Sequence, residues 1–163
     1  MICRCPFKAS PHYGKWLAVL ENQAMGWWLP GGGVDFGESF EAGGLRECVE
    51  EANVQVTIKG VLNVDYFSRV NGDKAKMRMI YYCEPVSLEA ANNPKDWVDR
   101  ESQKAEWKTV AELEELKRKK MLRGAELLNW ATYLESGGHI YPKCMFGDEG
   151  EDCNPASSAS FTL

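Results

Sequence analysis

The chain has 163 residues and a formal net charge of -5, and its 26% charged and 44% hydrophobic residues are ordinary for a soluble globular protein. This length suits one domain that is large enough to bury a core of its own. The negative charge argues against a broad basic surface, so we expect no nucleic-acid partner. No apolar run approaches the ~20 residues of a membrane span, and no signal-peptide pattern opens the chain. We therefore expect a cytoplasmic protein with no membrane partner.

The first part of the chain predicts strands followed by one helix. Residues 1–8 are a short mixed stretch with the character of an edge strand, limited by Pro6. Residues 15–21 are apolar on both alternating faces, which predicts a strand covered on both sides. After a glycine-rich turn, Ser39 is the predicted N-cap of a helix that runs to about residue 52. The expected buried stripe of this helix consists of Leu45, Cys48, Val49 and Ala52.

The second part predicts further strands and then two helices. In chain order we expect strands over 54–59, 61–70 and 76–84, a long polar loop over 85–101, a short strand over 106–108, and helices over 109–119 and 123–135. Asn71-Gly72 is a strong hairpin signal between two of these strands. Thr109 and Glu112 form a capping box at the start of a helix.

This order of elements predicts an α+β fold, or an α/β/α sandwich with a mixed β-sheet. We expect a single domain over residues 1–140. Residues 141–163 are rich in Gly, Asp, Glu, Ser and Pro, which predicts a disordered tail.

Six cysteines raise the alternatives of a zinc site, a disulfide framework or reduced thiols. Cys3 and Cys5 form a C-x-C pair, but no C-x2-C pair occurs, and the only two histidines, His12 and His139, are isolated. Reduced thiols are therefore the expected state for an intracellular chain.

The richest stretch is residues 29–54, where a triple glycine leads into a helix with clustered carboxylates. Glu47, Glu50 and Glu51 are spaced i, i+3 and i+4, so a helix projects them from one face. One interpretation is a solvated acidic face. The other is a site for a hard divalent cation, which takes oxygen ligands from carboxylates and from substrate phosphates.

The spacing of this stretch resembles the Nudix box, G-x5-E-x7-R-E-U-x-E-E-x-G-U, where U is apolar. The match starts at Gly32, continues through Glu38 and Arg46-Glu47, and ends at Val54. Its six fixed Gly, Glu and Arg positions coincide by chance in roughly 10^-5 of chains of this length. Two positions depart from the pattern. Asn53 replaces the last glycine, and Asn also tolerates the left-handed conformation at a helix end, while Cys48 fills an apolar slot.

The resemblance implies a loop-helix-loop catalytic motif beside a mixed sheet, and Mg2+ or Mn2+ as the cofactor. It implies that Glu47, Glu50 and Glu51 are metal ligands, with the backbone carbonyl of Gly31 as a further ligand. Arg46 would brace the carboxylates through ion pairs, and Glu38 would have a secondary role in structure or metal binding. The general base that activates water would be Glu50, Glu51 or, from the long loop, Glu101.

The implied reaction is hydrolysis of a nucleoside diphosphate linked to another moiety, with a nucleoside triphosphate or a sugar nucleotide both open. The alternative is a catalytically silent Nudix domain that binds nucleotides as a regulatory module. Candidate substrate contacts are the aromatic residues Trp27, Tyr66 and Phe67, which could stack on a base, and the cations Arg69, Lys76 and Arg78, which could meet phosphates. The alternative for the aromatic residues is packing in the core or on the sheet, and the alternative for the cations is a solvated position on a strand. The oligomeric state stays open, with a homodimer as one option.

Overall fold

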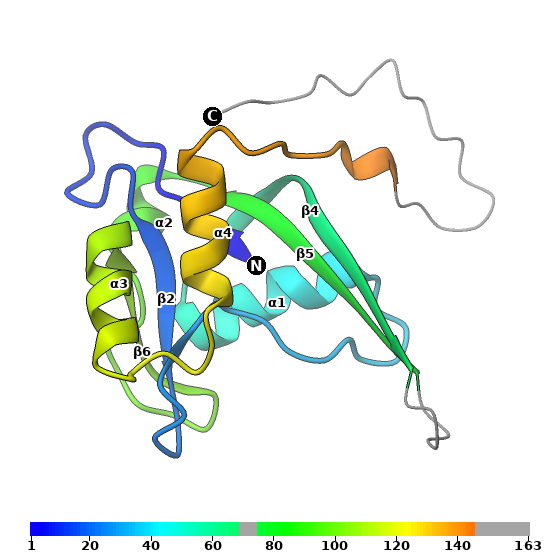
Figure 1. The fold of residues 1–163 in the computed structure, drawn as a ribbon, viewed down its shortest axis with the longest axis horizontal. Coiled ribbons are helices and arrows are strands. Elements are labelled where there is room, and N and C mark those ends of the chain that lie inside the picture. The colour runs from blue at the N-terminus through cyan, green and yellow to red at the C-terminus, as the bar shows by residue number, and fades with distance from the viewer. Residues whose placement is uncertain (69–74, 146–163) are drawn as a thin grey trace.

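The computed structural model describes residues 1–68 and 75–145 (Figure 1). Its strands are β1 (Ile2–Cys3), β2 (Trp16–Glu21), β3 (Trp27–Trp28), β4 (Val56–Ser68), β5 (Ala75–Pro85) and β6 (Ser102–Lys108). Its helices are α1 (Phe40–Ala52), α2 (Leu88–Asn92), α3 (Val110–Arg118), α4 (Glu126–Glu135) and the 3-10 helix η1 (Lys143–Met145).

The strands form two three-stranded sheets. One has the order β1-β5-β4 and is mixed, because β1 pairs with β5 in parallel while β4 pairs with β5 antiparallel. The other has the order β3-β2-β6 and is antiparallel. An antiparallel bridge between Arg4 and Trp16 joins the two sheets.

Helices cover both faces of the strands, so the expected α+β fold with its α/β/α layers is confirmed. Alternate residues of β2 separate the two cores: Leu17 and Val19 pack with α1, whereas Trp16 and Ala18 pack with α3 and α4. In Figure 1, α4 crosses in front of β5 and α1 lies behind it. This arrangement agrees with the prediction that residues 15–21 form a strand covered on both sides.

Both ends of α1 are capped as its sequence predicts. The hydroxyl of Ser39 accepts a hydrogen bond from the Ala42 N–H, and Asn53 takes the left-handed conformation with φ 55°. The expected buried stripe was partly wrong, because Val49 is exposed while Glu47 is buried. α1 is therefore rotated so that one of its carboxylates, and not an apolar side chain, lies under the glycine turn.

Three elements differ from the sequence expectations. Residues 56–68 form one strand where two were expected, since β4 runs unbroken from Val56 to Ser68 with register shifts near Gly60 and Asn63. The loop expected over 85–101 contains α2, whose N-cap Ser87 accepts from the Ala90 N–H. Strand β6 is also longer than expected, because pairing with β2 extends it back to Ser102. Asn71-Gly72 lies outside the described residues.

The chain stays packed beyond the boundary expected at residue 140. Tyr141 exchanges backbone hydrogen bonds of 2.8 Å with Val61 of β4, and η1 follows it. Residues 146–163 lie outside the described part of the chain. Within the described ranges, no helix has the length and apolar character needed to cross a bilayer.

Candidate active site

Arg46, on the second turn of α1, is the centre of the site. Its Nε and Nη2 donate to the two carboxylate oxygens of Glu38 at 2.9 and 3.0 Å, and Nη1 donates to Glu47 and Glu50 at 2.9 Å each. Nη2 also donates to the carbonyl of Gly33 at 2.9 Å. These bonds raise the pKa of Arg46 and hold the pKa of Glu38 below its usual range. One guanidinium therefore ties three carboxylates and the glycine turn together.

The glycine turn approaches α1 so closely that a side chain at Gly32 would displace the Glu47 carboxylate. A Cβ on Gly32 would lie 2.3 Å from Oε1 of Glu47 and 2.9 Å from its Oε2. Gly31 has a φ of 154°, and its N–H donates to Oε2 of Glu51 at 2.8 Å. The triple glycine thus permits backbone contact with two of the three expected ligands.

Glu51 has the most perturbed carboxyl group of the site. Burial raises its pKa to about 7; the Gly31 hydrogen bond opposes this shift, and the charges of Glu47 and Glu21 add to it. The N-terminal ammonium lowers the pKa of Glu51, but burial and the two carboxylates outweigh it. This electrostatic environment is what a bound divalent cation would relieve.

Glu21, at the end of β2, acts on this cluster through its charge, and no sequence motif marked it. One of its oxygens forms an ion pair with Arg123, and its Oε2 is buried with no hydrogen-bond partner among the described residues. Only the pairing of β2 with β3 and β6 brings this strand end to α1, so no local pattern could have identified it.

The three expected ligands fit a divalent cation in their chemistry. The recorded hydrogen bonds engage one oxygen of each carboxylate: Oε1 of Glu47, Oε2 of Glu50 and Oε2 of Glu51. The other oxygen of each, with the Gly31 carbonyl, forms a hard donor set suited to Mg2+ or Mn2+. Across residues 1–68 and 75–145, no three acidic, His or Cys side chains already converge at coordinating distance, so ion binding would require these side chains to move closer together.

The loop before β6 places Glu101 beside the end of α1. Ser102 donates from its hydroxyl to the Glu51 carbonyl at 2.7 Å, and the carboxylate of Glu101 pairs with Arg100 at 2.8 Å. Lys95, which sequence reasoning did not single out, donates to the Glu50 carbonyl at 2.9 Å and to Asp99 at 2.6 Å. This bond to Lys95 lowers the pKa of Asp99 to about 2.

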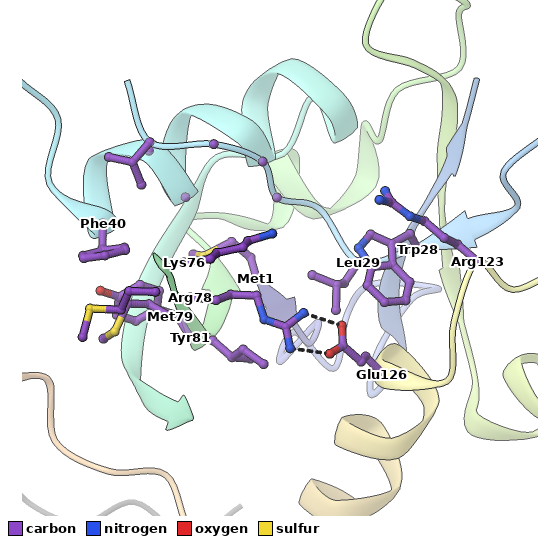
Figure 2. Close-up of a pocket in the computed structure, with 18 of the residues that line it drawn as sticks. Met1, Trp28, Leu29, Phe40, Lys76, Arg78, Met79, Tyr81, Arg123 and Glu126 are labelled. Atoms are coloured by element: carbon purple, nitrogen blue, oxygen red, sulfur yellow. Dashed lines mark hydrogen bonds and ion pairs between the residues drawn. The ribbon is translucent and has the colours of Figure 1, made fainter. Parts of the chain in front are cut away.

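A cavity of about 710 Å³ opens beside the glycine turn. Its walls come from the start of α1, from β5, from Trp28 and from the segment around Arg123 and Glu126. Figure 2 shows the Arg78–Glu126 pair facing into it, between Trp28 with Arg123 on one side and Phe40 with Met79 on the other. The cavity thus joins the carboxylate helix to apolar, aromatic and charged walls, which is the composition of a small-molecule site.

Of the two adjacent tryptophans, the structure places Trp28 in the cavity wall. Its ring lies 5.4 Å from the guanidinium carbon of Arg123. Trp27, the residue expected to contact substrate, is only 4% exposed and packs in the core under Lys108, whose Nζ is 4.7 Å from its ring centre. Successive residues of a strand point to opposite faces, so one position separates a core residue from a cavity residue.

The other expected substrate contacts are dispersed. Arg78 lines the cavity, but its guanidinium is bonded to Asp65 on β4 and to Glu126 on α4, with contacts between 2.5 and 3.0 Å. Tyr66 and Phe67 are 70% and 59% exposed on β4 and do not line this cavity. Lys76 lines the cavity, and Arg69 lies outside the described residues.

Comparison with known proteins decides the family. The model of the NUDIX domain matches residues 10–131, which is most of the chain. The chain belongs to the Nudix family. It is accordingly a hydrolase that acts on phosphoric anhydrides, and Nudix hydrolases generally use divalent metal ions and small-molecule nucleotide substrates.

Solved Nudix structures share the fold at low sequence identity. A NUDIX hydrolase from Nitrosomonas europaea is 18% identical, with a TM-score of 0.66 over 92% of this chain and 96% of that one. An Ap4A hydrolase from C. elegans is 21% identical, with a TM-score of 0.51 over 83% and 92%. A UDP-X diphosphatase is 19% identical, with a TM-score of 0.55 over 86% and 64%. No curated protein sequence matches the chain.

Proposed function

We propose that this Nudix protein is a metal-dependent pyrophosphohydrolase that cleaves the diphosphate of a nucleoside diphosphate linked to another moiety. The observation that carries the proposal is the carboxylate site around Arg46, which lies against the same glycine turn that lines the cavity. A nucleoside triphosphate or a sugar nucleotide fits this arrangement. Its phosphates would bind at the carboxylate site, and its base or sugar would bind in the cavity.

Glu47, Glu50, Glu51 and the Gly31 carbonyl would hold Mg2+ or Mn2+, which supplies charge neutralisation for the diphosphate and a water of lowered pKa. Arg46 keeps Glu47 and Glu50 in place by hydrogen bonds of 2.9 Å. The absence of a side chain at Gly32 leaves the Glu47 carboxylate undisplaced beside the turn that lines the cavity.

We assign the proton-accepting role to Glu101, with Glu50 and Glu51 as the alternatives. A carboxylate that serves as a metal ligand is a weaker base, and Glu101 is not one of the proposed metal ligands. Its backbone N–H is bonded to Asp99, and its neighbour Ser102 is bonded to Glu51, which holds Glu101 beside the ligand helix. Glu101 removes the proton of the attacking water, so that the new bond to phosphorus forms as the anhydride bond breaks.

The cavity wall would recognise the moiety attached to the diphosphate. Trp28 offers an indole face for a nucleobase, and Lys76 offers positive charge, whereas Arg123 is paired with Glu21 and stacks on Trp28. Arg78 is held by two carboxylates, so it shapes the wall with Glu126 rather than meeting phosphates directly. Two of the structurally similar proteins are named for nucleotide substrates, Ap4A and UDP-X, which is consistent with this class.

The test is turnover of a panel of nucleoside triphosphates, sugar nucleotides and dinucleoside polyphosphates with Mg2+ or Mn2+, with products measured by chromatography. Glu101→Gln should lower kcat by roughly 10²–10⁴-fold while Mn2+ affinity is retained. Glu50→Gln should lower both kcat and Mn2+ affinity. Glu114→Gln, at an exposed position of α3, should change neither kcat nor Mn2+ affinity. No turnover by wild type, or full turnover by Glu50→Gln, would overturn the proposal, and full turnover by Glu101→Gln would transfer the base role to Glu50 or Glu51.

A further inference from the structure

Lys95 is a buried cation in a protein whose other lysines are mostly at the surface. Its side chain is 0% exposed, and a buried ammonium is costly unless it is paired and hydrogen-bonded. Its Nζ donates to the Glu50 carbonyl at 2.9 Å and to Oδ1 of Asp99 at 2.6 Å. One of these two partners belongs to the helix that carries the metal ligands, and the other belongs to the loop that carries Glu101.

Asp99 continues the connection from Lys95 to the backbone of that loop. The same oxygen that accepts from Lys95 also accepts the N–H groups of Glu101 at 2.9 Å and of Ser102 at 3.2 Å. The position of the Glu101 backbone is therefore set by an atom that Lys95 holds in place.

Three further bonds attach this loop to the end of α1. The Lys95 N–H donates to the Ala52 carbonyl at 2.8 Å, Ser102 donates to the Glu51 carbonyl at 2.7 Å, and Asn53 donates from its side chain to the Asn93 carbonyl at 3.0 Å. The last carbonyls of a helix have no partner within the helix, so they need external donors. Here the donors come from one loop, and two of the accepting carbonyls belong to Glu50 and Glu51.

We propose that Lys95 is a positioning residue, which fixes the backbone of Glu50 and the backbone of Glu101 relative to each other. This inference rests on the proposed function, because it assigns Lys95 a task in metal binding and proton transfer. Lys95 contacts neither metal nor substrate in this role. It sets the distance between a ligand and the group that accepts the proton, as outer partners of metal ligands do.

The experiment compares Lys95→Met with wild type in the full chain, using Mn2+ alone as the probe. Free Mn2+ is measured by electron paramagnetic resonance, and amide hydrogen exchange is measured in the metal-free protein. Lys95→Met should weaken Mn2+ affinity by about 10–100-fold. It should also speed exchange in both residues 50–54 and residues 99–102, because the two segments lose their common anchor.

Two controls separate positioning from general destabilisation. Leu134→Ala, in the core on the opposite face, should lower the melting temperature and leave Mn2+ affinity unchanged below the transition. Lys59→Met removes a lysine charge from a surface ion pair with Glu84 and should leave both readouts unchanged. If Lys95→Met does not fold, Ser102→Ala replaces it and should weaken Mn2+ affinity by about fivefold through loss of one hydrogen bond to the Glu51 carbonyl.

The outcomes distinguish this inference from the proposed function. A wild-type protein that binds no Mn2+ overturns the metal-dependent function, and with it the task given to Lys95. A wild-type protein that binds Mn2+, together with a Lys95→Met or Ser102→Ala protein that binds it equally well, overturns the inference alone. Faster exchange in only one of the two segments also overturns it.

Discussion

The carboxylate helix and the cavity wall facing it are assembled in opposite ways. At the helix, Arg46 binds carboxylates that precede, adjoin and follow it within one short stretch, from Glu38 to Glu50. The wall combines Trp28 of β3, Arg78 of β5 and the α3–α4 segment that carries Arg123 with Glu126 at the start of α4. The proposed catalytic site therefore depends on local spacing, whereas the proposed recognition wall depends on long-range packing.

The two adjacent tryptophans, one in the core and one in the cavity wall, give the largest expected effects. Trp27→Ala should cost about 3–5 kcal/mol of unfolding free energy, because it leaves a cavity in the core. Trp28→Ala should cost less stability and instead raise KM by about tenfold, because a base loses its stacking surface. Urea unfolding and steady-state kinetics on both variants measure this. Equal stability losses with unchanged KM for Trp28→Ala would remove Trp28 from substrate binding.

Glu51→Gln tests whether the Glu51 carboxyl has a raised pKa in the folded, metal-free protein. The folded-state pKa of about 7 exceeds the ordinary value of 4.5, so the native protein retains a proton that the unfolded chain releases between these pH values. Metal-free wild type should therefore lose stability as the pH rises from 4.5 to 7. Glu51→Gln should be more stable than wild type at pH 8 by up to about 3 kcal/mol, and equally stable at pH 4.

Thermal unfolding in EDTA at several pH values measures the effect of Glu51→Gln. Added Mn2+ should make wild type more stable than Glu51→Gln at pH 8, since only wild type has the full ligand set. A Glu51→Gln protein that is less stable than wild type at pH 8 without metal would contradict the raised pKa.

Arg46→Met tests whether a single guanidinium organises the helix site. It should lower kcat at saturating Mn2+ by about 10–100-fold, because Glu38, Glu47 and Glu50 lose their common donor. Arg46→Lys should recover only part of the rate, since an ammonium supplies charge without the planar fork. Full recovery by Arg46→Lys would show that charge alone is sufficient.

Tyr66→Ala and Phe67→Ala test the boundary of the wall and should have the smallest effects. Both side chains are exposed on β4 and lie outside the cavity lining, so stability should change by about 0.5 kcal/mol or less, with kcat/KM unchanged. A several-fold rise in KM for either variant would extend the substrate site along β4, as the aromatic pattern of the sequence predicts.

Strong local signals were correct where the physics is local. The Ser39 cap and the Asn53 helix end each depend on hydrogen bonds between residues that are near neighbours in the sequence. Expectations failed where distant parts of the chain decide burial. Glu47 is buried because the glycine turn packs against the side of α1 that carries it, whereas Val49 is exposed.

The sequence by itself determined the family and the chemistry, because the spacing from Gly32 to Glu51 places a glycine turn, one arginine and three carboxylates along one turn-helix unit. Tertiary structure alone decided which distant groups join them. Lys95 and Ser102 reach the end of α1, Glu21 reaches Glu51, and Trp28 replaces Trp27 in the cavity, because strand pairing and loop closure set these contacts across long separations in sequence.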